Sequence, residues 1–213
     1  QLDYSFIKKS NLIVMHHLEK VNSGLSNSLK SFIDNGGSLL IFPSNKIDFD
    51  NYREFLSLIG VNYYTAIDSL SNKVKEINLK HPIYNNVFDD QPKENLNLPI
   101  VSSHYLISKG TTSFKNDILT LKNGNPFLTE YKVGKGSIYL SAVSLEKTSS
   151  NFTNHALFVP TLYNIALLSQ KNYPLFHIIG SNSTIELAHL EKDNVYHIKN
   201  NTIDIIPRVR NSN

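Results

Sequence analysis

The chain has 213 residues, of which 40% are hydrophobic and 18% charged, and its formal net charge is +3. A globular chain of this size can bury a core without disulfide bonds or metal ions. The absence of cysteine excludes disulfides, thiolate metal sites and a cysteine nucleophile, and the scattered positive charges do not indicate a nucleic-acid partner.

No apolar run approaches the 18 residues that a membrane-spanning helix requires. The sequence begins with Gln1 rather than Met. We therefore expect the chain to be a piece of a longer protein, with any membrane segments outside it.

A strand-helix-strand unit is predicted between residues 12 and 42. Its helix has four apolar residues at spacings of i, i+4, i+7 and i+8, namely Leu25, Leu29, Phe32 and Ile33. Ser23 or Ser26 can cap the helix, and Gly36 with Gly37 ends it. Continuous apolar runs at 12–15 and 38–42 are typical of strands that helices cover on both faces.

The next elements are less regular. A second helix is predicted to begin at Asp48 or Asp50 and to end at Gly60, followed by a strand at 61–64. Within residues 65–117, which show few clear patterns, we expect a strand at 73–79 and an edge segment at 98–101.

Three strands are predicted next, at 118–121, 126–133 and 137–143, with a Gly-Lys-Gly hairpin turn at 134–136. A phosphate-binding loop would need a helix after these glycines, and a strand follows instead. The segment 155–169 is apolar nearly all round, so we expect a buried helix.

Beyond Asn172 the sequence changes to short alternating strands, predicted at 176–179, 184–187, 195–198 and 203–209. We therefore divide the chain into an α/β domain at 1–172 and a β-rich tail at 173–213. The tail either adds strands to the sheet or begins a second β domain.

Two motifs, FIDNGGSLLIFPS and EYKVGKGSIYL, resemble class I glutamine amidotransferase-like domains. The resemblance implies a flavodoxin-like, mostly parallel sheet with helices on both faces. In active members the strand corresponding to 38–42 leads to a cysteine, and a later His-x-Glu pair completes the triad. Here the turn is Pro43-Ser44-Asn45, and the stretch corresponding to the pair, residues 141–146, contains no histidine. The resemblance therefore implies a non-catalytic domain.

The combination of NGGSLLIFPS, NGNPFLTEYKVGKGSIYL and SNFTNHALFVPTLYNIAL more closely resembles one group of bacterial membrane proteins. These carry an aerotolerance-regulator (BatA-type) amino-terminal segment with two transmembrane helices. The resemblance covers about residues 1–180 by pattern. It implies an inner-membrane-anchored protein whose soluble domain faces the periplasm, with a first strand and helix upstream of Gln1 or absent. Other envelope or membrane proteins are the partners it implies.

A serine-hydrolase alternative would make Ser44 the nucleophile, with His155 and either Asp48 or Asp50 completing a triad. The sequence lacks the Gly-x-Ser-x-Gly turn, and Pro43 disfavours such a turn. The simpler interpretation is that Ser44 turns the chain and that His155 begins a helix.

No metal or cofactor is predicted. The adjacent His16 and His17 would point to opposite faces of a strand, and His189 and His197 belong to no metal-binding motif. Dispersed histidines on the surface or in the core are the expected outcome.

The sequence therefore favours an interaction or structural module whose binding surface is the former active-site opening. Its candidate residues are Pro43, Ser44, Asn45, Ser144, Glu146, Phe152 and His155. The other alternative is a carbohydrate-binding module like the trehalose-utilisation relatives of this fold. Exposed aromatic residues at the opening would favour sugar, with Tyr63, Tyr64, Tyr105 and Phe152 as candidates, whereas an opening without a cavity would favour protein contacts.

Overall fold

The computed structural model describes residues 4–88, 97–110, 114–170, 195–199 and 202–207. Contacts divide the chain into two units, Gln1–Lys171 and Asn172–Asn213, and each is described by itself. No helix in these ranges is both long enough and apolar enough to cross a membrane.

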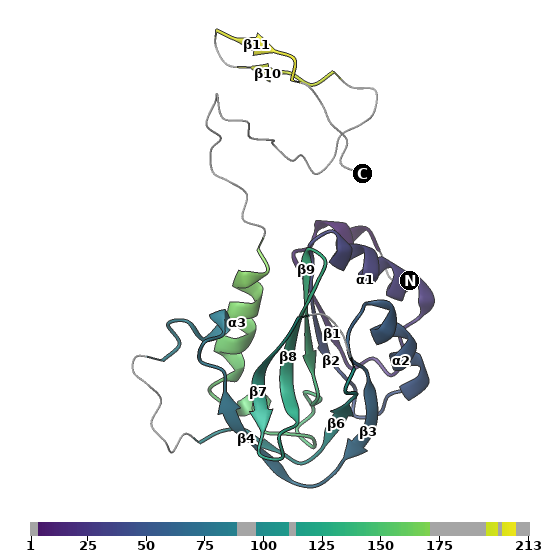
Figure 1. Ribbon diagram of the computed structural model, residues 1–213, viewed down its shortest axis with the longest axis vertical. Coiled ribbons are helices and arrows are strands. Elements are labelled where there is room, and N and C mark those ends of the chain that lie inside the picture. The colour runs from purple at the N-terminus through teal and green to yellow at the C-terminus, as the bar shows by residue number, and fades with distance from the viewer. Residues whose placement is uncertain (1–3, 89–96, 111–113, 171–194, 200–201, 208–213) are drawn as a thin grey trace. The chain divides into compact units, whose positions relative to one another are not determined.

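The first unit is built around a mixed seven-stranded sheet (Figure 1). Its strands, in spatial order, are β1 (Leu12–His16), β2 (Ser38–Phe42), β9 (Gly136–Ser141), β8 (Pro126–Val133), β7 (Lys115–Leu121), β4 (Asn72–Ile77) and β5 (Ile100–Val101). β1, β2 and β9 are parallel neighbours, and the other pairs are antiparallel. The predicted α/β class is therefore confirmed, but the sheet expected to be mostly parallel is mixed, because parallel pairing is confined to three adjacent strands.

Helices cover both faces of this sheet, as the fully buried strand β2 requires. Leu39 and Ile41 face a core that includes residues of α1 (Ser23–Asp34) and α2 (Phe49–Leu58). Leu40 and Phe42 face a second core that includes residues of α3 (Phe158–Leu168). Figure 1 shows α1 and α2 on one side of the sheet and α3 on the other.

The caps of the first two helices fix where each begins. The cap of α1 is Asn22, whose side chain accepts a hydrogen bond from Leu25 N, so neither Ser23 nor Ser26 has this role. The predicted cap of α2 is Asp48, which accepts from Asn51 N. Gly36 has a φ of +88°, which explains the glycine at the end of α1.

Short 3₁₀ segments and a strand pair complete the unit. The 3₁₀ segments are η1 (Tyr4–Lys9), η2 (Pro82–Tyr84) and η3 (Phe152–Asn154). β3 (Tyr64–Asp68) pairs with β6 (His104–Ile107) in a separate antiparallel ribbon. A strand is expected at 61–64, and the observed strand β3 begins only at Tyr64. Val61 and Asn62 are buried but precede the strand.

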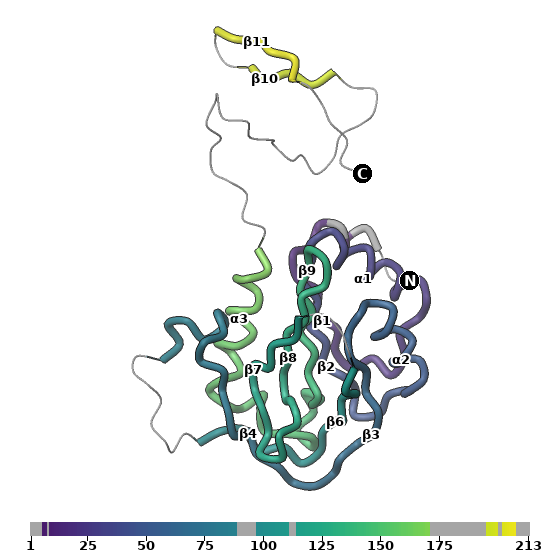
Figure 2. Tube along the Cα trace, in the orientation of Figure 1, coloured from purple at the N-terminus to yellow at the C-terminus, as the bar shows by residue number. Residues whose placement is uncertain are grey.

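The hairpin between β8 and β9 has the predicted turn. Val133 pairs with Gly136 across Gly134 and Lys135, and Gly134 has a φ of +56°. β9 then lies between β2 and β8, which Figure 2 traces along the Cα path. The hairpin therefore places the last strand of the sheet in its interior, between two earlier strands.

The prediction of a buried helix at 155–169 is wrong in two respects. α3 begins at Phe158, and only Thr161 and Ile165 within it are buried. Val159 and Tyr163 are 70% and 62% exposed. An apolar composition cannot by itself bury a helix, because each face also needs an element packed against it.

In the second unit, β10 (Ile198–Lys199) and β11 (Asp204–Ile205) form an antiparallel pair. They overlap the strands predicted at 195–198 and 203–209. The strands predicted at 176–179 and 184–187 lie outside the described residues.

Candidate functional site

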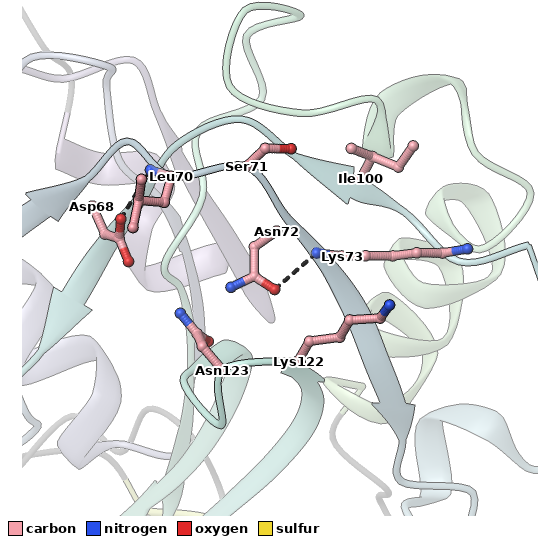
Figure 3. A pocket seen from close by; sticks show the side chains of 8 residues that line it. All are labelled: Asp68, Leu70, Ser71, Asn72, Lys73, Ile100, Lys122 and Asn123. Carbon is pink, nitrogen blue, oxygen red and sulfur yellow. Dashed lines mark hydrogen bonds between the residues drawn. The ribbon is translucent and has the colours of Figure 1, made fainter.

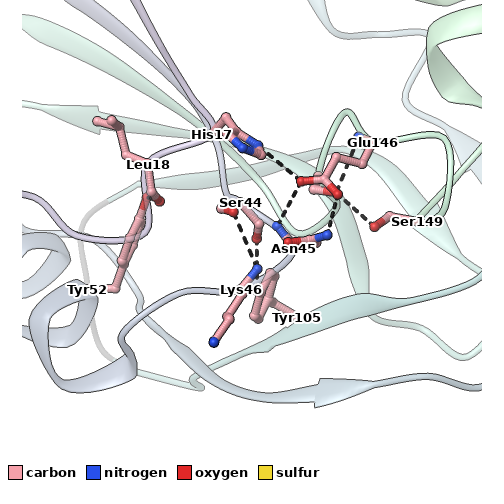
Figure 4. Close-up of polar contacts among 10 residues, drawn as sticks. His17, Leu18, Ser44, Asn45, Lys46, Tyr52, Tyr105, Glu146 and Ser149 are labelled. Carbon is pink, nitrogen blue, oxygen red and sulfur yellow. Dashed lines mark hydrogen bonds and ion pairs between the residues drawn. The ribbon is translucent and has the colours of Figure 1, made fainter.

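The candidate site lies at the carboxyl ends of the three parallel strands, the edge where open α/β sheets bind ligands. Here β1 leads to His17, β2 leads to Ser44 and Asn45, and β9 leads to Ser144 and Glu146. We call these five residues the mouth. Figure 4 shows four of them, His17, Ser44, Asn45 and Glu146. The parallel order of the strands is what brings them together.

Glu146 joins all three parts of the mouth. Its Oε1 lies 3.1 Å from His17 Nδ1, and its Oε2 accepts a hydrogen bond from the Asn45 side-chain amide. The backbone N–H of Asn45 donates to Oε1 at 3.4 Å. The Glu146 side chain is only 24% exposed, compared with 62% for His17, so the carboxylate lies between the loops.

His17 itself has a φ of +58°. This left-handed backbone conformation is uncommon for residues other than glycine and costs about 1 kcal/mol or more. The contact of its imidazole with Glu146 occurs in that conformation. The mouth therefore includes both a histidine–carboxylate contact and a locally strained backbone.

Ser44 is 1% exposed. Its hydroxyl accepts a hydrogen bond from Lys46 N at 3.4 Å, and its carbonyl accepts one from the Tyr105 hydroxyl at 2.8 Å. Within the described ranges no imidazole or carboxylate is bonded to the Ser44 hydroxyl. Ser44 therefore turns the chain, as the simpler interpretation of the sequence predicts.

Two other members of the alternative triad, His155 and Asp48, are engaged elsewhere. His155 Nε2 donates to the carbonyl of Asn97, and its Nδ1 accepts from Leu157 N. Asp48 caps α2 and pairs with Lys20 at 2.8 Å. The structure therefore gives Ser44 no catalytic base among the described residues.

Ser144 and Phe152 occupy buried positions. The Ser144 hydroxyl lies 2.8 Å from that of Ser149, whose backbone N–H donates to the carbonyl of Glu146 at 2.9 Å. Phe152 is 1% exposed and packs edge-on against Phe127 and Phe158. Placing Phe152 on the binding surface is therefore wrong, because its ring belongs to the core that includes α3.

The aromatic residues considered for sugar binding do not line an open surface at the mouth. Tyr64 and Tyr105 are 1% and 4% exposed, with ring centroids 5.0 Å apart. The Tyr64 hydroxyl donates to Ser141 O, and burial raises the pKa of Tyr105 to about 12. Tyr63 is half-buried, with the Arg53 guanidinium 5.1 Å from its ring centroid.

A small cavity of about 10 Å³ lies below the mouth, with room for at most one water molecule. It is lined by Asn45, Ile67, Ser103, His104, Tyr105, Ser144 and Ser149. His104 Nδ1 is buried without a hydrogen-bond partner among the described residues. Burial lowers the pKa of His104, against a weaker opposing effect of Asp68, which favours the neutral imidazole.

Sequence reasoning considered His17 only as a metal ligand and did not consider His104. In the described ranges no three His, Asp or Glu side chains form a group that could hold a metal ion. His197 pairs with Asp204, and His189 lies outside these ranges. A signal for His17 was present, because it directly follows a strand parallel to β2.

The sequence matches no family model and no curated protein. The fold, however, is similar to many solved structures. A cytoplasmic protein from Salmonella typhimurium is 12% identical, with 78% of this chain and 74% of that chain covered and a TM-score of 0.58. A protein described as putative ThuA-like, from Bacteroides uniformis, is 14% identical, with 78% and 71% covered and a TM-score of 0.53.

A β-galactosidase from Rahnella sp. R3 is also similar, at 16% identity and a TM-score of 0.51. The match covers 74% of this chain but only 22% of the enzyme. At these identities the comparisons show a shared fold. By its fold, this chain is thus a mixed α/β domain similar to the ThuA-like protein.

Proposed function

We propose that this chain is a non-catalytic, class I glutamine amidotransferase-like domain that binds another protein through its mouth. The observation that carries the proposal is the position of Glu146, which is bonded to His17 and Asn45 while Ser44 is buried beneath them. A catalytic opening needs an accessible nucleophile and a base to activate it. In this chain the opening instead contains the Glu146 carboxylate, which is bonded to His17 and Asn45.

The small size of the cavity below the mouth favours a protein partner over a sugar. A cavity of about 10 Å³ is far below the hundreds of Å³ typical of small-molecule sites. Tyr64, Tyr105 and Phe152 are buried, so none offers a flat aromatic face to a sugar ring. The similarity to a ThuA-like protein supports the amidotransferase-like fold and does not add a sugar site.

The exposed residues around the mouth indicate which chemical groups a partner should carry. His17, Asn45, Lys46 and Lys147 are exposed around the partly exposed Glu146. A polar rim of this kind fits a partner with complementary hydrogen-bonding groups and a carboxylate that meets the lysines. Following the sequence resemblance, we propose that the partner is an envelope protein and that the domain is anchored to the inner membrane facing the periplasm.

Site-specific crosslinking tests this proposal. A photoreactive residue replaces Lys46 at the mouth or, as the control, Lys135 at the β8–β9 turn, and each variant is added to a solubilised envelope fraction. We expect a discrete crosslinked protein from position 46 and none from position 135. The same product from both positions, or from neither, would contradict the proposal.

The hydrolase alternative has its own test. Wild-type protein and Ser44→Ala are assayed side by side on a panel of ester and amide substrates, with folding checked by circular dichroism. We expect equal background rates, because Ser44 has no base among its described contacts. Hydrolysis that disappears in Ser44→Ala would instead identify a serine hydrolase.

A further inference from the structure

A second depression, with a volume of about 630 Å³, lies at the end of the β3–β6 ribbon and beside the β7–β8 turn (Figure 3). It is lined by Asp68, Leu70, Ser71, Asn72, Lys73, Ile100, Lys122 and Asn123. β7 runs in the same direction as β9, so its carboxyl end lies at the same edge of the sheet as the mouth. Ligand sites of α/β folds occur along this edge.

Two lysines lie side by side in this depression. Lys122 N donates to Lys73 O at 2.9 Å, so the two residues are neighbours across β4 and the end of β7. Figure 3 shows their side chains extending in the same direction. Neither ammonium group forms an ion pair in the part of the chain that the structure describes. Adjacent like charges on neighbouring strands are unfavourable, and a bound anion would relieve their repulsion.

Two asparagines are set to donate hydrogen bonds to a ligand. The side-chain oxygen of Asn72 accepts from Lys73 N at 2.9 Å, and that of Asn123 accepts from Asn125 N at 3.1 Å. Each oxygen is engaged with backbone, and Asn123 Nδ2 also lies 3.4 Å from His104 Nε2. The Asn72 amide and the second N–H of Asn123 can therefore donate to a ligand. Amide donors of this kind suit the hydroxyl oxygens of a sugar.

The single acidic side chain of the lining, Asp68, accepts a hydrogen bond within the protein. Its Oδ1 accepts from Leu70 N at 2.9 Å, and its Oδ2 lies 3.8 Å from His104 Nε2. Leu70 and Ile100 are 76% and 47% exposed. They add apolar surface that can contact the C–H groups of a ligand.

We propose that this depression binds a small hydroxylated organic anion, an acidic sugar of one or two rings. The carboxylate or phosphate of the sugar lies on Lys73 and Lys122, and its hydroxyls bond to Asn72 and Asn123. The volume suits a ligand of this size. The site is separate from the mouth and does not depend on the function proposed for it.

Titration calorimetry on the 213-residue chain tests the proposal. The probes are glucuronate, glucose 6-phosphate, neutral glucose and inorganic phosphate, measured at low ionic strength because salt screens exposed charges. The variants are Lys73→Gln, Lys122→Gln and, as the matched control at the far end of the sheet, Lys135→Gln. The wild type and all three variants are measured in the same buffer, and circular dichroism checks the folding of each.

We expect glucuronate or glucose 6-phosphate to bind, with affinity reduced about fivefold by each lysine substitution in the depression. Lys135→Gln should bind as the wild type does. Equal binding of neutral glucose would overturn the anionic part of the proposal, and equal binding of inorganic phosphate would overturn the sugar. No binding by either acid, or equal loss in Lys135→Gln, would overturn the site.

Discussion

Glu130 is a buried carboxylate that contacts a histidine and a lysine. Its Oε2 lies 3.0 Å from His81 Nε2, and its Oε1 lies 2.7 Å from Lys132 Nζ. Burial alone would raise the pKa of Glu130, but hydrogen bonds and charge from His81 and Lys132 together lower it to about 2. Because Ile83 N donates to His81 Nδ1, the Nε2 atom of His81 carries the proton that Glu130 accepts.

We expect this carboxylate to make stability depend on pH. Its folded-state pKa lies below the ordinary 4.5, so its contribution is complete above about pH 4.5 and is lost as the pH falls toward 2. Glu130→Gln should lower the free energy of unfolding by about 2 kcal/mol at pH 7. Urea unfolding at pH 7 and pH 3 measures both effects.

The exposed Glu76 provides the control. Glu76→Gln should leave the free energy of unfolding within about 0.5 kcal/mol of wild type at pH 7. If Glu130→Gln keeps the wild-type loss of stability between pH 4.5 and pH 3, Glu130 is not the group responsible.

At the scale of the elements, Gly136 lies where β9 passes close to the end of α1. A Cβ on Gly136 would lie 2.4 Å from Ile33 O and 2.5 Å from Gly37 O. Both are backbone atoms, so relief requires α1 or β9 to move. We expect Gly136→Ala to destabilise the domain by about 3 kcal/mol.

Gly124 separates this steric effect from backbone strain. It has a φ of +82°, and a Cβ added there would meet no atom of the described residues within 4 Å. Gly124→Ala should therefore cost only about 1 kcal/mol. Thermal and urea unfolding compare the two variants. If both variants lose the same stability, the close approach of β9 to α1 does not add to the cost of Gly136→Ala, and the steric prediction is wrong.

The uneven burial of α3 gives a further prediction. Ile165 is completely buried, whereas Leu167 is 44% exposed. Ile165→Ala should therefore destabilise the domain by about 3 kcal/mol, and Leu167→Ala by less than about 0.5 kcal/mol. A loss above 1 kcal/mol in Leu167→Ala would mean that another part of the protein covers this face of α3.

At the scale of the whole molecule, both hydrophobic cores of the described residues lie within the unit Gln1–Lys171. We expect a shortened chain of residues 1–171 to fold and to have a Tm within about 2 °C of the 213-residue chain, since no core residue is removed. Differential scanning calorimetry on both chains measures this. A fall of Tm by about 10 °C would place stabilising contacts beyond Lys171.

The strand-helix-strand unit and the β8–β9 hairpin could be predicted because their signals are local. A stripe at helical spacing, Gly36, and the turn at Gly134 each act within a few residues. The β3–β6 ribbon could not be predicted in this way, because its strands pair across a long, irregular segment. A local pattern also cannot report which apolar face of α3 meets a neighbour.

The candidate site shows the same limit. The turn at Ser44 can be predicted from the apolar run before it, and the structure places Ser44 in that turn. The contacts of Glu146 with His17 and Asn45 could not be predicted, because they join three loops that only the completed sheet brings together. The Tyr105 hydroxyl on Ser44 O depends on tertiary packing in the same way.

The position of β9 between β2 and β8 has a consequence for synthesis on the ribosome. β1, α1 and β2 emerge early, but the other edge of β2 is paired only by residues 136–141. Until then the nascent chain carries an unpaired apolar strand edge, which other chains can pair with. Chaperone protection is therefore most valuable between the emergence of Phe42 and that of Ser141. A ribosome that stalls in this interval releases a polypeptide prone to aggregation.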